Sequence, residues 1–119
     1  MTTENGIDWK KIKNLQKIGG DKLLKKLYIL FLEKTPQQVD SFFQNYQIQN
    51  WRNIENTAHS LKSSTGNLGL TLLYSLSQTL ESKAHQGIFS EILPLIQSFQ
   101  SEFERIQPIL QQELQKMPS

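Results

Sequence analysis

The stretch that decides the fold runs from Trp51 to Gly69 and reads WRNIENTAHSLKSSTGNLG. Its apolar and small residues recur in steps of three and four, which only a helix places on one face. They are Trp51, Ile54, Ala58, Leu61, Thr65 and Leu68. Asn50 is suited to cap the start of this helix and Gly69 to end it in a left-handed conformation. The pattern therefore predicts an amphipathic helix whose apolar face lies in a core.

The opposite face of the same helix carries a histidine. At the helical rotation per residue, His59 lies about 140° from the centre of the apolar stripe, so its imidazole is expected to face solvent. Residues one or two turns away share that face. They are Glu55, Lys62, Ser63 and Gly66. The exposed face therefore combines a histidine with a carboxylate, a cation, a hydroxyl and a position without a side chain.

This group of residues suits a phosphoryl group. The pKa of an unperturbed imidazole is about 6.5, so the neutral ring is a nitrogen nucleophile near pH 7. Lys62 can neutralise charge on the oxygens of a phosphoryl attached to the ring. Ser63 can donate a hydrogen bond, and Gly66 leaves room for a partner surface to come close. We therefore expect His59 to be a phosphoryl acceptor.

The motif resembles the signature of histidine-containing phosphotransfer (HPt) domains. The matching residues are His59-Ser-Leu-Lys-Ser63, Gly66-Asn-Leu-Gly69 and Leu80-Glu81, with support from Gly19-Gly20-Asp21, Phe31, Thr35-Pro36 and Gly87. The resemblance runs from about Ile7 to the C-terminus. One position departs from it, because Ser63 stands where the family usually has glycine directly after the lysine.

The resemblance implies a function and roles for individual residues. It implies a protein that relays a phosphoryl group between receiver-domain aspartates, or from a sensor kinase, through phospho-His59. By the same resemblance Glu81 accepts a hydrogen bond from Nδ1 of His59, which leaves Nε2 as the nucleophile. Judged from the residues alone, Glu81 can also be an ordinary surface carboxylate. The alternative function is a phosphate-free helical adaptor that keeps the shape and binds receiver or kinase domains.

Two more polar residues are candidates for the edge of the site. Gln78 and His85 share a helical face with Glu81, so either could touch the phosphoryl group, although both could equally be polar residues near a helix end. A metal site built from His59, Glu81 and His85 matches no zinc spacing, and we expect no metal.

The chain lacks the parts of a self-sufficient kinase. It contains no glycine-rich phosphate loop with which to bind ATP. Its three aspartates, Asp8, Asp21 and Asp40, each lie near a predicted helix start or on a helix surface, whereas an aspartyl receiver needs clustered acids to hold Mg²⁺. We therefore expect a phosphoryl carrier without a cofactor of its own, whose partner receiver supplies the Mg²⁺.

The composition and charge of the chain limit its domain count, its partners and its location. The 119 residues suit one domain spanning 1–119, and with no cysteine the chain can form no disulfide. A net charge of +2 with interspersed signs argues against a nucleic-acid surface. Lysines gather between residues 10 and 26, either as solvated helix faces or to steer an acidic partner. The longest apolar run, Leu27 to Leu32, is too short for a bilayer. Without signal-peptide features, we expect a cytoplasmic monomer that binds no membrane.

The remaining patterns complete an all-α fold. Asp8 can cap a short helix that includes Ile7 and ends at Gly19-Gly20. A second helix, kinked at Pro36, is expected over Asp21–Tyr46, and a third over about residues 70–86. Ser90 can cap the last helix, which Pro108 should kink or divide. The sum is an up-and-down antiparallel four-helix bundle with a short N-terminal helix.

Two sets of side chains are assigned from these patterns. Leu30 and Leu72 fall on the inner stripes of their helices and are expected in the core. The surface that contacts a partner needs some apolar area, for which Leu70, Tyr74 and parts of the second helix are candidates.

Overall fold

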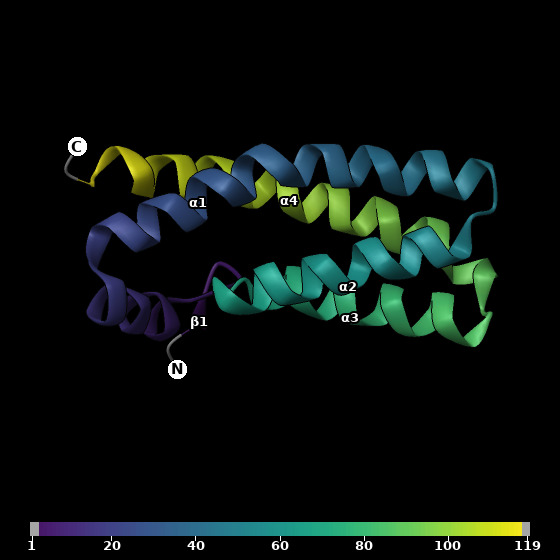
Figure 1. Cartoon of the computed structure of the whole chain (residues 1–119), viewed down its shortest axis with the longest axis horizontal. Helices are drawn as coiled ribbons and strands as arrows, with labels where there is room; N and C mark the ends of the chain where they lie inside the picture. The colour runs from purple at the N-terminus through teal and green to yellow at the C-terminus, as the bar shows by residue number, and fades with distance from the viewer. Residues whose placement is uncertain (1–2, 118–119) are drawn as a thin grey trace.

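Four α-helices run antiparallel along the long axis of the molecule (Figure 1). The computed structural model describes residues 3–117. The helices are α1 (Trp9–Gln47), α2 (Trp51–Asn67), α3 (Thr71–Gln86) and α4 (Ile92–Gln115). The predicted up-and-down bundle is confirmed, and α2 and α3 lie side by side as a hairpin (Figure 1).

Helix α1 contains the predicted short N-terminal segment. Gly20 has φ 71° and ψ −174°, a backbone conformation that ends the first segment and turns the chain into the long one. Figure 1 shows the first segment folded back across one end of the bundle. Ile12 on this segment is buried, so the segment covers the end of the core as a lid.

The two prolines inside helices do not divide them. The long part of α1 continues through Pro36, with Thr35 and Val39 both buried on either side of it. Helix α4 likewise continues through Pro108 to Gln115. Of the two outcomes predicted at Pro108, division of the last helix does not occur, because Ile106 and Leu110 keep the same helical phase in the core across it.

The predicted caps are present at three helix ends and absent at one. Asp8 accepts a hydrogen bond from the Lys11 backbone N–H at 3.4 Å, Asn50 caps α2, and Gly69 follows α2 with a left-handed φ of 67°. Ser90 does not cap α4, because it lies within a short 3₁₀ helix, η1 (Phe89–Glu91). In this tighter turn the ring of Phe89 stacks on that of Trp51, with the ring centroids 4.2 Å apart. The stacking favours the 3₁₀ turn over a helix that begins at Ser90.

The core is formed by inward stripes from all four helices. Its largest fully buried side chains are Tyr28, Phe42, Phe99, Ile7, Leu24, Ile54, Leu61, Leu70, Leu73, Leu80, Ile92 and Ile96. Leu30 and Leu72 were wrongly assigned to it, since they are 38% and 47% exposed. Each lies one residue, or about 100° of helix, before a buried neighbour, Phe31 or Leu73. No helix between residues 3 and 117 is long and apolar enough to cross a membrane.

A small β-hairpin precedes α1 and was not predicted. Strands β1 (Thr3–Glu4) and β2 (Ile7–Asp8) pair antiparallel, so Ile7 belongs to a strand and not to the first helix. The backbone N–H of Asp8 donates to the Gly69 carbonyl at 2.7 Å, and that of Thr71 donates to the Gly6 carbonyl at 2.9 Å. The hairpin is thereby tied to the turn between α2 and α3.

Gly69 is the residue that lets the hairpin come this close. Its φ is 67°, and a Cβ added there would lie 2.9 Å from the Asp8 carbonyl oxygen. Any other side chain would push the strand away from the turn. The N-terminal strand and Gly69 together fix the turn that sets how α2 and α3 lie against each other.

Candidate functional site

The line along which α2 and α3 meet, called the α2–α3 seam below, carries the candidate residues. Ala58 on α2 and Ala84 on α3 are buried beneath it. Small side chains at a helix contact allow the helix axes to approach. Polar side chains at the rim of the seam can therefore reach from one helix to the other.

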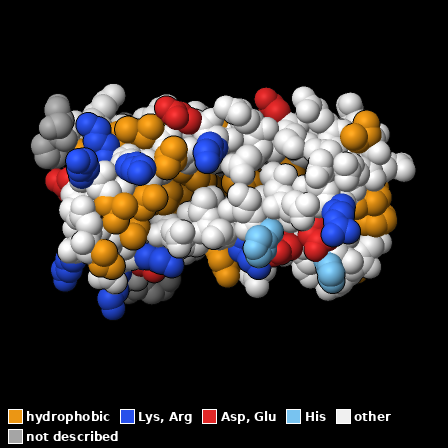
Figure 2. Space-filling model, viewed as in Figure 1, with side chains coloured by type: hydrophobic (Ala, Val, Ile, Leu, Met, Phe, Trp, Pro, Cys, Tyr) orange, Lys and Arg blue, Asp and Glu red, His pale blue; other side chains and the backbone are white. Residues whose placement is uncertain are grey.

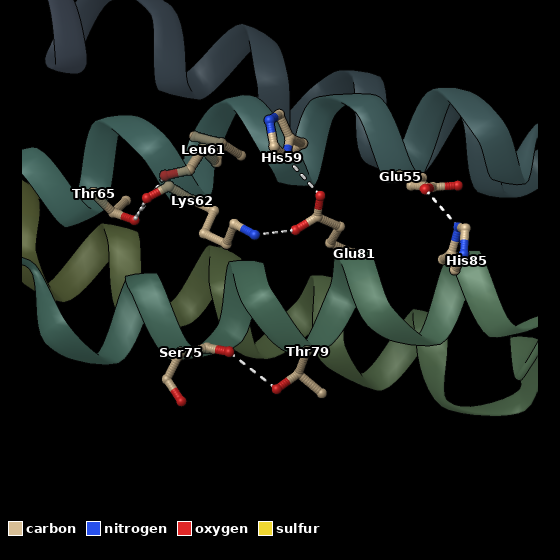
Figure 3. Close-up of polar contacts among 9 residues, drawn as sticks. All are labelled: Glu55, His59, Leu61, Lys62, Thr65, Ser75, Thr79, Glu81 and His85. Atoms are coloured by element: carbon tan, nitrogen blue, oxygen red, sulfur yellow. Dashed lines mark hydrogen bonds and ion pairs between the residues drawn. The ribbon is translucent and has the colours of Figure 1, made fainter.

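His59 and Glu81 form one such cross-helix contact. Nδ1 of His59 lies 2.6 Å from Oε2 of Glu81 (Figure 3). The histidine side chain is 67% exposed, whereas that of Glu81 is 20% exposed. The hydrogen bond expected from the resemblance is therefore present, with the carboxylate below and the ring open to solvent.

Lys62 holds the other oxygen of the same carboxylate. Its Nζ lies 2.6 Å from Oε1 of Glu81 (Figure 3). This contact holds the pKa of Glu81 below its usual value, with the hydrogen bond from His59 as a further cause. The same hydrogen bond to Glu81 raises the pKa of Lys62. Both groups are therefore charged at neutral pH.

The ionised carboxylate determines which ring nitrogen carries the proton. A carboxylate without a proton can only accept hydrogen bonds, so Nδ1 of His59 must be the donor. In a neutral imidazole the other nitrogen, Nε2, then has a free lone pair. The arrangement can present a neutral, oriented nucleophile on an exposed ring.

The other predicted site residues fall into two groups. Glu55 does not join the His59 cluster, because its Oε2 lies 2.9 Å from Nδ1 of His85. His85 therefore pairs with Glu55 across the seam and not with Glu81. Ser63 and Gln78 are exposed on α2 and α3, and no hydrogen bond joins either side chain to another described residue.

Gly66 has a structural contact as well as a predicted functional one. A Cβ added to Gly66 would lie 3.1 Å from the ring of Tyr74. Part of the space that a glycine leaves at this position is therefore filled by an aromatic ring of the same chain. Tyr74 itself is 38% exposed and stays a candidate for a partner contact, whereas Leu70 is fully buried and was wrongly proposed for that surface.

A groove lined in part by Ser60, the residue after His59, was not predicted from the sequence. It has a volume of about 200 Å³ and lies between α1 and α2. Apolar residues of α1 and polar residues of α2 line it, among them Leu27, Leu30, Phe31, Ser60 and Ser64. Figure 2 shows apolar side chains with basic ones around them on the face that also carries both histidines. Leu30 lines this groove and is 38% exposed. The sequence pattern placed Leu30 in the core, so the groove could not be predicted from it.

Between residues 3 and 117, the positions of the histidines and carboxylates decide whether these side chains could hold a metal ion together. Within the part of the chain that the structure describes, no group of three or more His, Cys, Asp or Glu side chains is placed to hold a metal ion.

The fold and the site place the chain among helical bundles that display a carboxylate-oriented histidine on their surface. The Hpt domain family model matches residues 26–117, and the chain belongs to this family of histidine phosphotransfer domains. Its function is accordingly histidine phosphotransfer in a phosphorelay.

One solved structure supports the fold assignment. The chain is similar to the crystal structure of histidine-containing phosphotransfer protein B (HptB) from Pseudomonas aeruginosa PAO1. The match has a TM-score of 0.91 and 24% sequence identity, and it covers 98% of this chain and 100% of that one. The search of curated proteins gave no match.

Proposed function

We propose that Nε2 of His59 is the atom that carries the phosphoryl group. The observation that carries the proposal is the 2.6 Å contact between Nδ1 of His59 and Glu81 beneath a ring that is 67% exposed. Since Glu81 holds the proton on Nδ1, the lone pair of Nε2 points to solvent, where an incoming phosphoryl donor can reach it.

The donor in this proposal is the aspartyl phosphate of a receiver domain. The Nε2 lone pair attacks phosphorus in line, an N–P bond forms, and the P–O bond to the aspartate breaks to release its carboxylate. The Nδ1 proton stays in its hydrogen bond, so Glu81 balances the positive charge that develops on the ring. In the onward step the aspartate carboxylate of a second receiver attacks phosphorus, a P–O bond forms, and the N–P bond to Nε2 breaks to free the imidazole. A sensor kinase of the same relay is the alternative donor.

Lys62 acts in two ways in the proposal. In the free protein it holds Glu81 in place from the opposite oxygen. As the phosphoryl group arrives, its fixed positive charge one helical turn from the histidine offsets the charge on the phosphoryl oxygens. The Mg²⁺ that such a transfer requires is supplied by the receiver, so this chain contributes the nucleophile and its orientation but does not phosphorylate itself.

The receiver docks over the exposed face around His59. Ser63 and Gly66 lie one and two turns along α2 from the histidine and form the near part of the contact. The groove with Leu27 and Leu30 supplies apolar area that docking can remove from water. The lysines of α1 around this area favour a partner with an acidic surface.

The test is transfer from a phosphorylated receiver domain to this chain, with His59→Gln as the comparison. The parent should gain a label that is lost in acid and stable in base, and peptide mapping should place it on His59. The variant should lose this rapid label while keeping the parent's helical circular dichroism. Labelling of His59→Gln at the parental rate would refute the assignment, and receiver binding without any transfer to the parent would favour the adaptor function.

A further inference from the structure

The sequence of the site occurs twice in the α2–α3 seam. Glu55-Asn-Thr-Ala58-His59 on α2 and Glu81-Ser-Lys-Ala84-His85 on α3 both read Glu-x-x-Ala-His. In each copy the alanine is buried and the histidine is exposed. Because the two helices are antiparallel, the glutamate of each copy faces the histidine of the other.

The two copies form two equivalent hydrogen bonds. Nδ1 of His59 lies 2.6 Å from Glu81, and Nδ1 of His85 lies 2.9 Å from Glu55. Figure 3 shows both pairs along the seam. Glu55 and His59 are four residues apart on α2, so the two pairs lie about one helical turn apart. An approximate local twofold axis, perpendicular to the helices, therefore exchanges one histidine with the other.

The chemistry of the second pair matches that of the first. His85 is 75% exposed, while its partner Glu55 is 30% exposed. An ionised glutamate can only accept, so Nδ1 of His85 carries the proton and Nε2 is left free. Figure 2 shows both histidines on one face of the molecule, so a partner docked at one lies beside the other.

We propose that His85 is a second phosphoryl-accepting histidine, with Glu55 as its positioning residue. The inference rests on the proposed function of His59, whose cross-helix arrangement it repeats. Nε2 of His85 attacks phosphorus, the N–P bond forms, and the bond from phosphorus to its leaving group breaks. The leaving group is the aspartate carboxylate of a receiver. The Nδ1–H stays donated to Glu55.

One difference makes the second acceptor slower. Lys62 follows His59 by three residues and contacts Glu81, whereas the residue three after His85 is Ile88. Among the described residues, His85 is the one ion-pair partner of Glu55. The second site therefore orients its ring without a fixed cation beside it, and we expect transfer to His85 to be about 10-fold slower or more, since a charge-assisted contact is missing.

The experiment uses phosphoramidate, a small P–N donor, and then the phosphorylated receiver that labels the parent chain. With phosphoramidate the imidazole nitrogen displaces ammonia, so no docking is required. His59→Gln should gain one acid-labile phosphate on His85 from either donor, and His59→Gln/His85→Gln should gain none. A His59→Gln chain that neither donor labels would overturn the proposal.

Glu55→Gln in the His59→Gln background tests the positioning role. Labelling of His85 should fall about 10-fold, the usual loss when the orienting partner of a histidine is removed. The ¹⁵N shifts of the His85 ring should show loss of the Nδ1–H tautomer, a change that mere destabilisation would not cause. An unchanged labelling rate would show that His85 reacts only as an exposed imidazole, and it would overturn the positioning role of Glu55.

The two hypotheses can fail separately. His85→Gln should still be labelled on His59 by the receiver, and failure of that reaction counts against the proposed function. The labelling of His59→Gln reports on His85 alone. Label confined to His59 in the parent and absent from His59→Gln would leave the proposed function intact and refute the second acceptor.

Discussion

The two histidine–glutamate pairs of the α2–α3 seam, which are called its His59 end and its His85 end below, use the same hydrogen bond in different surroundings. At one end Glu81 is held by His59 and Lys62 together, each at 2.6 Å. At the other, Glu55 is paired with His85 at 2.9 Å. The comparison separates two requirements of a phosphoryl acceptor, because orientation of the ring is common to both ends and the fixed cation belongs to one.

The largest effect of a change outside the histidines is expected from Glu81→Gln. A glutamine keeps the shape, but its amide can donate to Nδ1 and favour the wrong tautomer of His59. Transfer from a receiver to His59 should fall about 10-fold to 100-fold. Rapid-quench measurement of the transfer rate at saturating receiver checks this.

Glu55→Gln is the matched control for that change. It alters the same atoms at the other end of the seam and should leave the rate at His59 within about 2-fold of the parent. An equal loss of rate in both variants would mean that the Glu55–His85 pair also affects transfer to His59. The two pairs would then not be independent.

Lys62→Ala tests the cation that the second end lacks. It removes one charge-assisted contact to Glu81 and the positive charge beside the phosphoryl oxygens. Because a positive charge beside the phosphoryl oxygens stabilises the transition state, transfer should slow by about 10-fold or more without it. Receiver binding, measured by calorimetry, should change much less than the rate.

Lys83→Ala provides the control for lost positive charge. Lys83 lies on α3 two residues after Glu81, and its Nζ is 3.0 Å from Glu91, outside the His59 site. Its removal should leave the transfer rate unchanged. If Lys62→Ala transfers as fast as Lys83→Ala, Lys62 has no place in the site.

A smaller effect is expected on the pH dependence of folding. The pKa of Glu81 is lowered in the folded chain, chiefly by the hydrogen bond from Lys62. Its stabilising contribution is therefore complete above the usual glutamate pKa of 4.5 and is lost as the pH falls below that value. The free energy of unfolding, measured by urea titration at several pH values, should fall less steeply below about pH 5 in Glu81→Gln than in the parent. An identical slope in the variant and the parent would show that Glu81 does not keep its contacts with Lys62 and His59 in solution.

Much of this arrangement could be predicted from the sequence because helices repeat regularly. The stripe that includes Ile54, Ala58 and Leu61 fixed which way α2 faces, and thus that His59 is exposed. The contact of His59 with Glu81 came from the resemblance, since spacing within one helix does not say which residues meet across two. The pairing of His85 with Glu55 was missed for the same reason.

The N-terminal hairpin shows a different limit. Asn5-Gly6 is a strong signal for a two-residue hairpin turn, and both residues have positive φ, 55° and 76°. The signal was hidden because the flanking strands are two residues long and stabilised by distant groups. Arg105 of α4 donates to the Asn5 carbonyl at 2.6 Å and pairs with the buried Glu102. Such contacts depend on the assembled bundle.

The smallest effect is expected at Ser63, where the chain departs from its family. The side chain is exposed one turn from His59, and no hydrogen bond ties its hydroxyl to another described residue. Ser63→Gly should therefore transfer to His59 at least as fast as the parent, at a cost of about 0.5 kcal/mol in helix stability.

Ser63→Ala separates the two parts of the side chain, since it removes the hydroxyl but keeps Cβ. If Cβ obstructs the receiver, the alanine variant should resemble the parent and only the glycine variant should be faster. Slower transfer in both variants would show instead that the hydroxyl donates to the phosphoryl group, and the end of the seam at His59 would then differ from the other by a hydroxyl as well as a cation.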